Sequence, residues 1–362
     1  MYSTDHPPYA NKLVVPLLPK GVKGLWNIRN DDLFNFRWGN PEYTARYYKN
    51  LPPPNVTAGM HMGSDGYVWA RLVHDRVDTT AHGLEIEKHW YNFAQWGKCA
   101  FQACDEEHDM GPAFWMAELA SRFPELSKVP GSAAVLYAGW ANASDTVSQV
   151  NRLVIGKWVN DMQWSPEGCF NRDGIGGTGA KPVPGTSTPD GFVDVVKFAQ
   201  YQPVEGSNIV RIPDYARAVA AGKSPSGITP VQVVDNLRAL ASAAEKAVDW
   251  LRASLPAPGP SQELGAVLND IKAFVLLGRY YADKLCGATE LGLLNATQQA
   301  AHRSRAVACL QDGVAQWKAY AAQASAQYSY PQLLARVRVL DVVGFTAGAE
   351  RDVQLAAGAG AA

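Results

Sequence analysis

Two short stretches of this chain place carboxylates where a strand would end. The first, NIRNDD, closes with Asp31 and Asp32, and the second, MHMGSDGYVW, holds Asp65 between two glycines. Glycine permits positive φ values and close backbone approach, which the edge of a sheet often requires. Two carboxylates facing one pocket are suited to general acid and general base catalysis. The alternative is that these residues only form a turn and a helix cap.

Aromatic residues gather in the same part of the chain as these acids. A flat ring beside a few fixed polar groups suits a sugar, whose C–H face stacks on the ring. Trp90 and Trp96 recur at helical spacing, which favours packing, so we expect about two of the seven rings at a ligand. The seven rings are Trp26, Trp38, Tyr67, Trp69, Trp90, Trp96 and Trp164, and His61 lies in the same part of the chain.

A third candidate is the stretch NDMQWSPEGC, in which Glu167 follows Trp164 just before a loop rich in glycine and proline. It is predicted either to fold over the mouth of the site as a rim or to be a solvated surface loop. The GIGGTG run at 174–179 is followed by AKPVPG rather than by a helix, so it is interpreted as a flexible loop and not as a cofactor fingerprint. The histidines show no metal-ligand spacing, and we expect neither a metal nor a cofactor.

Composition narrows the function classes further. The 362 residues carry 33 basic and 34 acidic side chains, and this balance, with no basic block, argues against nucleic acid as a partner. No apolar run is long enough for a membrane span, and the first residues lack the pattern of a signal peptide. The five cysteines are an odd number without a CxxC pair, so we predict buried thiols that leave the compartment open.

The elements that must position the acids come in the order strand, helix, strand. Short extended segments are predicted in KLVVPLL, GLWNIRN and TAGMHMG, with a helix in NPEYTARYYK between the last two. This is a βαβ unit, whose parallel strands end at one edge. From residue 85 onward the spacing is helical, including helices over 229–255, 261–294 and 297–328 and a shorter one from Pro331. A buried stripe is expected at Leu268, Ile271, Val275, Leu276, Tyr280 and Leu285.

The stretches NIRNDDLFNFRWGNPEYTARYYKNLP, TAGMHMGSDGYVWAR and EKHWYNFAQWGKCAF resemble the distal half of the catalytic barrel in bacterial α-glucuronidase-like glycoside hydrolases. The tail NDIKAFVLLGRYYADKLCGATELGLL is similar to the helical domain that follows this barrel. The resemblance implies an α/β plus all-α, helix-dominated fold that starts with a partial (β/α)8 TIM-like barrel. It divides the chain into distal barrel strands (1–85), helices and rim loops (86–222), a helical bundle (229–345) and a flexible tail (346–362).

The resemblance also implies roles for single residues. Asp65 is the favoured base, with Asp32 or Asp31 beside it, and Arg29 or Lys88 would bind a uronate carboxylate next to Asn30. The remaining expected substrate contacts are Trp38, His61, Tyr67, Trp69, Trp164 and Glu167.

The implied partner is an oligosaccharide or polysaccharide from plants or algae, and the implied location is periplasmic or extracellular, with the cytoplasm as the alternative. Too few residues precede GLWNIRN to supply the first half of a barrel. We therefore expect either a fragment of a longer hydrolase or a chain that completes its sheet through a partner. The alternative function is a non-catalytic carbohydrate-binding or scaffolding protein.

Overall fold

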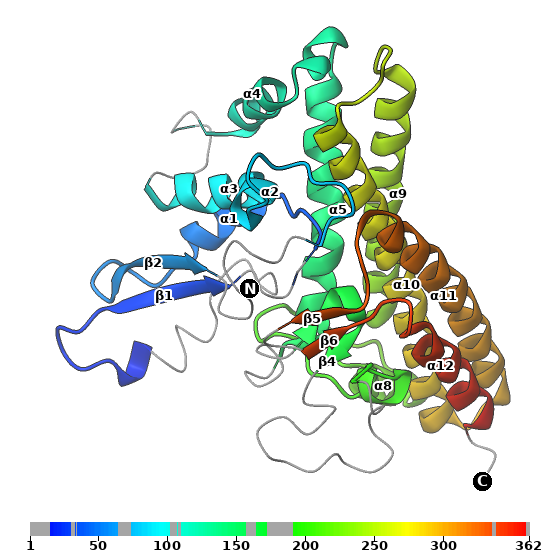
Figure 1. Ribbon diagram of the computed structural model, residues 1–362. Helices are drawn as coiled ribbons and strands as arrows, with labels where there is room; N and C mark the ends of the chain where they lie inside the picture. The colour runs from blue at the N-terminus through cyan, green and yellow to red at the C-terminus, as the bar shows by residue number, and fades with distance from the viewer. Residues whose placement is uncertain are drawn as a thin grey trace.

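Helices dominate the computed structural model of the chain (Figure 1). The structure describes residues 15–29, 33, 35–63, 74–101, 107, 110–156, 164–171, 191–334 and 338–359. Within these ranges a small βαβ unit lies at one side, and long helices form the body of the molecule (Figure 1). The expectation of a helix-dominated fold is confirmed.

The βαβ unit is built from β1 (Gly24–Arg29), α1 (Pro41–Lys49) and β2 (Thr57–Gly63). Pro41 is the first residue of α1, and Asn40 Oδ1 accepts a hydrogen bond from the Tyr43 amide at 3.0 Å, which caps the helix. The two strands pair in parallel, as the order of elements predicted. The expected strand in KLVVPLL is wrong for its described part, because Val15–Leu17 form a single 3-10 turn.

Further helices continue from residue 85, in agreement with the helical spacing. They include α2 (Glu85–Lys88), α3 (Trp90–Phe101), α4 (Pro112–Arg122), α5 (Ser132–Val154), α7 (Val195–Phe198) and α8 (Ile212–Ala220). Two short strands, β3 (Trp164–Ser165) and β4 (Phe170–Asn171), pair antiparallel between α5 and α7. The long helix α5 packs against the helices described next, so the middle of the chain and the C-terminal block share one core.

The C-terminal block contains α9 (Pro230–Ser254), α10 (Gln262–Thr297) and α11 (Ala300–Gln327). Thr229 and Gln232 form a capping box at the start of α9, and Ser261 caps α10. Short connections reverse the chain, so α10 packs between its two neighbours in sequence. The whole predicted stripe is buried: Leu268, Ile271, Val275, Leu276, Tyr280 and Leu285.

Two expectations for the end of the chain are wrong. The helix predicted from Pro331 is instead an antiparallel hairpin of β5 (Gln332–Leu334) and β6 (Arg338–Leu340), in which Gln332 is buried. The flexible tail expected from residue 346 contains α12 (Thr346–Gly358), which packs on α11. The hairpin follows from tertiary contacts, which override local pattern in short strands. The helix α12 agrees with its own sequence, TAGAERDVQLAAG, in which alanine and other helix formers prevail.

A buried ion pair holds α12 in place. Lys284 of α10 contacts the carboxylate of Asp352, whose other oxygen accepts a hydrogen bond from the Val195 amide at 2.7 Å. Burial raises the pKa of Asp352 to about 6, although Lys284 and the Val195 amide act in the opposite direction. The pair therefore joins α10, α12 and the start of α7 at one point.

The parallel sheet contains two strands within the described part of the chain. The barrel expected from the family resemblance is not visible there, and it stays a prediction. No helix in the described ranges is long and apolar enough to cross a membrane.

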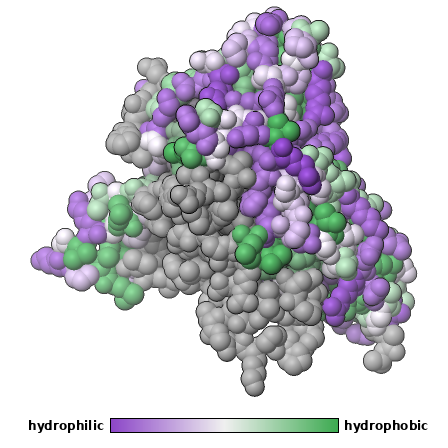
Figure 2. Space-filling model, viewed as in Figure 1, coloured by the Kyte–Doolittle hydropathy of each residue, from purple (hydrophilic) through white to green (hydrophobic). Residues whose placement is uncertain are grey.

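Hydrophobic residues exposed on the visible face include groups around the β1–β2 unit and over the β5–β6 hairpin (Figure 2). Leu17 precedes β1 and is exposed, and Leu25 within β1 is 65% exposed. On the hairpin, Leu333 is 76% exposed opposite Val339, its partner in the register. A strand residue such as Leu25 usually packs under a neighbouring layer.

The prediction that the cysteines are buried thiols is wrong for most of those described. Cys286 of α10 and Cys309 of α11 form a disulfide with their Cα atoms 6.0 Å apart, and Cys99 is disulfide-bonded as well. Only Cys169 among the described residues is a free, buried thiol. Structural disulfides persist in oxidising compartments.

We expect removal of the bond between α10 and α11 to destabilise the fold. The double variant Cys286→Ser/Cys309→Ser should lose about 3 kcal/mol of unfolding free energy, because the bond closes a loop of 23 residues. Urea denaturation measures the loss, and non-reducing peptide mapping of protein made in an oxidising compartment should recover the linked peptides. Free, alkylatable thiols at both positions would contradict the expectation.

Candidate functional site

The C-terminal ends of β1 and β2 lie at one edge of the sheet. Their register closes with Arg29 opposite Gly63, so the segments that follow both strands leave from the same edge. The side chain of Arg29 is not among those described. The same holds for His61, and Asn30, Asp31, Asp32, Asp65, Tyr67 and Trp69 lie outside the described residues. The predicted roles of these residues stay predictions.

The segment that follows β1 is anchored by Glu167. Its Oε1 accepts hydrogen bonds from the amides of Asn35 at 2.9 Å and Phe36 at 3.0 Å. Asn35 also exchanges two side-chain hydrogen bonds of 3.0 Å with Gln332 of β5. Glu167 is fully buried, so it holds the backbone rather than forming a rim that contacts substrate.

Two tryptophans expected at a sugar are core residues. Trp38 is fully buried, stacks on Trp96 with ring centroids 6.2 Å apart, and donates its Nε1–H to the Ser144 carbonyl oxygen. Trp164 is buried and donates to Asn151 Oδ1 at 2.8 Å. Both expectations are wrong for the same reason. A tryptophan in the core and a tryptophan at a sugar each bury an apolar ring and give the indole N–H a polar partner, so the residue type does not distinguish a core position from a ligand contact.

The segments that follow β1 and β2 contribute to a cluster of four buried charges, Arg37, Asp75, Lys88 and Asp270. Arg37 NH1 contacts Asp270 Oδ2 at 2.8 Å, and its NH2 lies 3.6 Å from Asp75 Oδ2. Lys88 Nζ lies 3.1 Å from Asp75 Oδ1. The side chains are at most 2% exposed, and Tyr328 at the end of α11 donates to Asp270 Oδ1 at 2.5 Å.

The charges in this cluster are balanced, two positive and two negative. Burial lowers the pKa of Lys88 against the opposing effect of Asp75, and burial raises the pKa of Asp270 against that of Arg37. For Arg37 burial acts downward, but the attraction of Asp270 prevails and the pKa is raised. The neighbouring His89 has a pKa well below its usual value because of burial and the nearby cations. Its imidazole is therefore neutral at pH 7.

Lys88 was expected to bind a uronate carboxylate, and the structure corrects this. Its ammonium group is paired with Asp75 and lies 4.3 Å from the centre of the Tyr328 ring. An incoming carboxylate would have to displace a partner that is itself buried, which leaves an unpaired charge behind. Arg29 is the remaining candidate for that role.

The charged cluster fixes both segments that leave the strand ends. Arg37 belongs to the segment after β1, and Asp75 to the one after β2, while Asp270 is on the buried face of α10 in its N-terminal part. Sequence reasoning missed this cluster because Arg37 and Asp270 are far apart in the chain. One signal was present: Asp270 falls on the same helical face as Val267 and Phe274, where a charge requires a partner.

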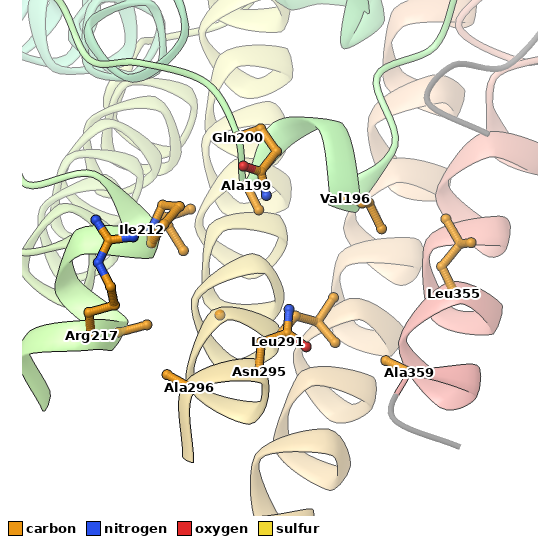
Figure 3. Close-up of a pocket in the computed structure, with 13 residues that line it drawn as sticks. Val196, Ala199, Gln200, Ile212, Arg217, Leu291, Asn295, Ala296, Leu355 and Ala359 are labelled. Atoms are coloured by element: carbon orange, nitrogen blue, oxygen red, sulfur yellow. The ribbon is translucent and has the colours of Figure 1, made fainter. Parts of the chain in front are cut away.

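One cavity of about 310 Å³ lies among α7, α8, α12 and the C-terminal part of α10 (Figure 3). Its lining is largely apolar, including Ile212, Leu291 and Leu355, with Arg217 at its border. None of the candidate site residues lines it. No group of three or more potential metal ligands occurs among the described residues.

A second cavity of about 450 Å³ adjoins the charged cluster. It lies between residues 75–79, the first turns of α10 and the last turns of α11, and Asp75 belongs to its lining.

Comparison with known proteins finds similarity to solved structures. No protein-family model matches the chain, and no curated protein matches it. The chain is similar to the solved structure of a GH138 enzyme targeting pectin rhamnogalacturonan II, with a TM-score of 0.67 and 12% sequence identity. The match covers 92% of this chain and 47% of that one, so the chain spans about half the length of the GH138 enzyme. The two share a fold over the matched residues.

The charged cluster yields a stability prediction. Asp270→Ala should lower the free energy of unfolding by about 3–5 kcal/mol, because it leaves Arg37 buried without its nearest counter-charge. Asp249→Ala on the exposed face of α9 is the control and should change it by less than about 0.5 kcal/mol. Chemical denaturation measures both, and equal effects would show that the buried cluster stabilises the fold no more than an exposed acid does.

Proposed function

We propose that this chain belongs to a glycoside hydrolase acting on plant or algal polysaccharide. The observation that supports this most is the fold match with a GH138 enzyme over 92% of the chain. That enzyme targets pectin rhamnogalacturonan II, and a plant-derived glycan is accordingly the proposed substrate class here.

The proposed catalytic groups are the carboxylates that follow the two parallel strands. Asp65 comes two residues after Gly63, and Asp32 comes three residues after Arg29, with Asp31 before it. Catalytic residues of parallel α/β enzymes gather at the C-terminal ends of strands. We assign the base to Asp65 and the acid to Asp32 or Asp31, with Tyr67 and Trp69 as sugar contacts.

The βαβ unit is proposed to be part of a barrel whose other strands come from a preceding segment or a partner. Support comes from Leu25, a strand residue that is 65% exposed, and from the share of the GH138 structure that the chain spans. A barrel with missing strands would expose sheet edges and apolar surface of this kind.

The α-glucuronidase-like specificity is the finer part of the proposal. Arg29 would bind the uronate carboxylate, since a guanidinium forms two parallel hydrogen bonds with it. The disulfides at Cys286 and Cys99 support an oxidising compartment, in accord with a periplasmic or extracellular location.

We expect Asp65→Asn to lower hydrolysis of activated glycosides by about 10²–10⁴-fold, the usual contribution of a positioned acid or base. The substrates are aryl glycosides and glycuronides whose phenolate leaves without protonation, so the assay needs no general acid. Asp249→Asn is the matched control and should retain wild-type rates, because Asp249 is exposed on α9.

The outcome separates the two candidate functions. Release of phenolate that depends on Asp65 identifies the sugar and supports a hydrolase. Saturable oligosaccharide binding without release of phenolate from any substrate would instead support a carbohydrate-binding or scaffolding protein. Full activity in Asp65→Asn would end the assignment of that residue.

A further inference from the structure

Four of the ten described residues that line the cavity beside the charged cluster carry carboxamides. The cavity lies between the start of α10, the end of α11 and the loop 75–79, with a volume of about 450 Å³. This is within the range of about 300–1,000 Å³ usual for small-molecule sites. The lining is Asp75, Val77, Thr79, Gln262, Gly265, Ala266, Asn269, Gln323, Ala326 and Gln327.

The chemistry of this lining selects a class of ligand. Carboxamides both donate and accept hydrogen bonds, as sugar hydroxyls do, and the lining holds four of them. Two already have partners within the protein, since Gln327 Nε2 donates to Asp270 Oδ1 and Asn269 Oδ1 accepts from Arg252, which leaves Gln262 and Gln323 as the main polar contacts for a ligand. Gly265, Ala266 and Ala326 form a small apolar surface on which a C–H face can rest. The cluster to which Asp75 of the lining belongs has two positive and two negative charges, so its sum favours no net charge on a ligand. A neutral, polyhydroxylated ligand matches all three properties.

Gly265 is a glycine that packing does not require. A Cβ atom at Gly278 would lie 2.9 Å from Thr146, and one at Gly287 would lie 2.5 Å from Leu310, so these glycines of α10 permit close helix contacts. A Cβ at Gly265 would meet no atom within 4 Å. Glycine in a helix costs about 0.5–1 kcal/mol relative to alanine, and at this position its effect is to keep the cavity open.

The wall of the cavity contains a buried carboxylate with unused hydrogen-bonding capacity. Asp75 Oδ1 lies 3.1 Å from Lys88 Nζ and Oδ2 lies 3.6 Å from Arg37 Nη2, so each oxygen has one cationic neighbour, while a carboxylate oxygen can accept two hydrogen bonds. Buried charged groups at the wall of a cavity are frequent at binding sites. Thr79, which accepts from Arg37 NH2 at 2.9 Å, joins the cluster to the same wall.

We infer that this cavity is a subsite for a neutral sugar unit, bound by the carboxamides of α10 and α11 over Gly265. The inference rests on the proposed function only for the choice of a saccharide as ligand. It assigns binding, and no bond-breaking step, to these residues.

The test fills the cavity without disturbing the core. Gly265→Met introduces a side chain into open space and improves helix propensity, so it should fold normally. Gly97→Met is the matched control, since Gly97 is also a helical glycine with free space around it and does not line the cavity. Gln323→Ala removes one amide whose described hydrogen bond is a long one of 3.4 Å to the Asn269 carbonyl.

Binding is measured by isothermal titration with neutral oligosaccharides released from pectic polysaccharide, in an Asp65→Asn background so that no probe is consumed. Hydrogen–deuterium exchange then locates the ligand. We expect protection of peptides covering 262–270 and 323–327, a loss of affinity of tenfold or more in Gly265→Met, and a smaller loss in Gln323→Ala. Gly97→Met should bind as the parent does.

The results distinguish this inference from the proposed function. Binding and protection that Gly265→Met leaves unchanged, or no saccharide binding at all, would overturn the subsite. If Gly265→Met abolishes protection while no glycoside is hydrolysed by wild type, the subsite stands and the hydrolase assignment fails. Hydrolysis that depends on Asp65, with exchange at 262–270 unaffected by the ligand, supports the hydrolase and overturns the subsite.

Discussion

The contact between Arg37 and Asp270 is the constraint on which the arrangement of the molecule depends. Burying a single charge costs several kcal/mol unless a partner of opposite sign is held against it. Arg37 follows the first strand and Asp270 is on the central helix α10, and their atoms approach to 2.8 Å. Asp75 and Lys88 complete the neutral set, so the segments that follow both strands are fixed to the same helix. These contacts therefore hold in place the segments that follow the C-terminal ends of both strands.

Other buried carboxylates fasten irregular segments in the same way. Glu167 accepts the amides of Asn35 and Phe36, and Asp352 accepts the amide of Val195 while it pairs with Lys284. A backbone amide outside helix or sheet needs an acceptor when it is buried, and a carboxylate supplies a strong one. These acids are therefore structural, which explains why acidic residues near tryptophans do not by themselves mark a sugar site in this chain.

The sequence predicts the secondary structure correctly where the pattern of apolar residues extends over many positions. Helices α9, α10 and α11 and the parallel β1–β2 pair follow from periodicity and element order, because many residues contribute to each pattern. Short segments are different: β5 has three residues, and Gln332 within it is hydrogen-bonded to the distant Asn35, a contact that no local pattern encodes. For the site, Trp38, Trp164, Glu167 and Lys88 have the residue types of a sugar pocket, but burial places them in the core. Burial is a property of the whole fold, and residue type alone does not report it.

The cavity over Gly265 and the strand ends share a physical link through Asp75. This residue lines the cavity, pairs with Lys88 and Arg37, and belongs to the segment that returns from the second strand. A ligand can shift the position of that segment only to the extent that it interacts differently with two arrangements of the cluster. The cluster is tightly packed and charge-balanced, so displacing Asp75 would leave Lys88 unpaired at a cost of several kcal/mol. A neutral sugar in the cavity would not supply that energy. A ligand in the proposed subsite accordingly leaves the geometry at the strand ends unchanged.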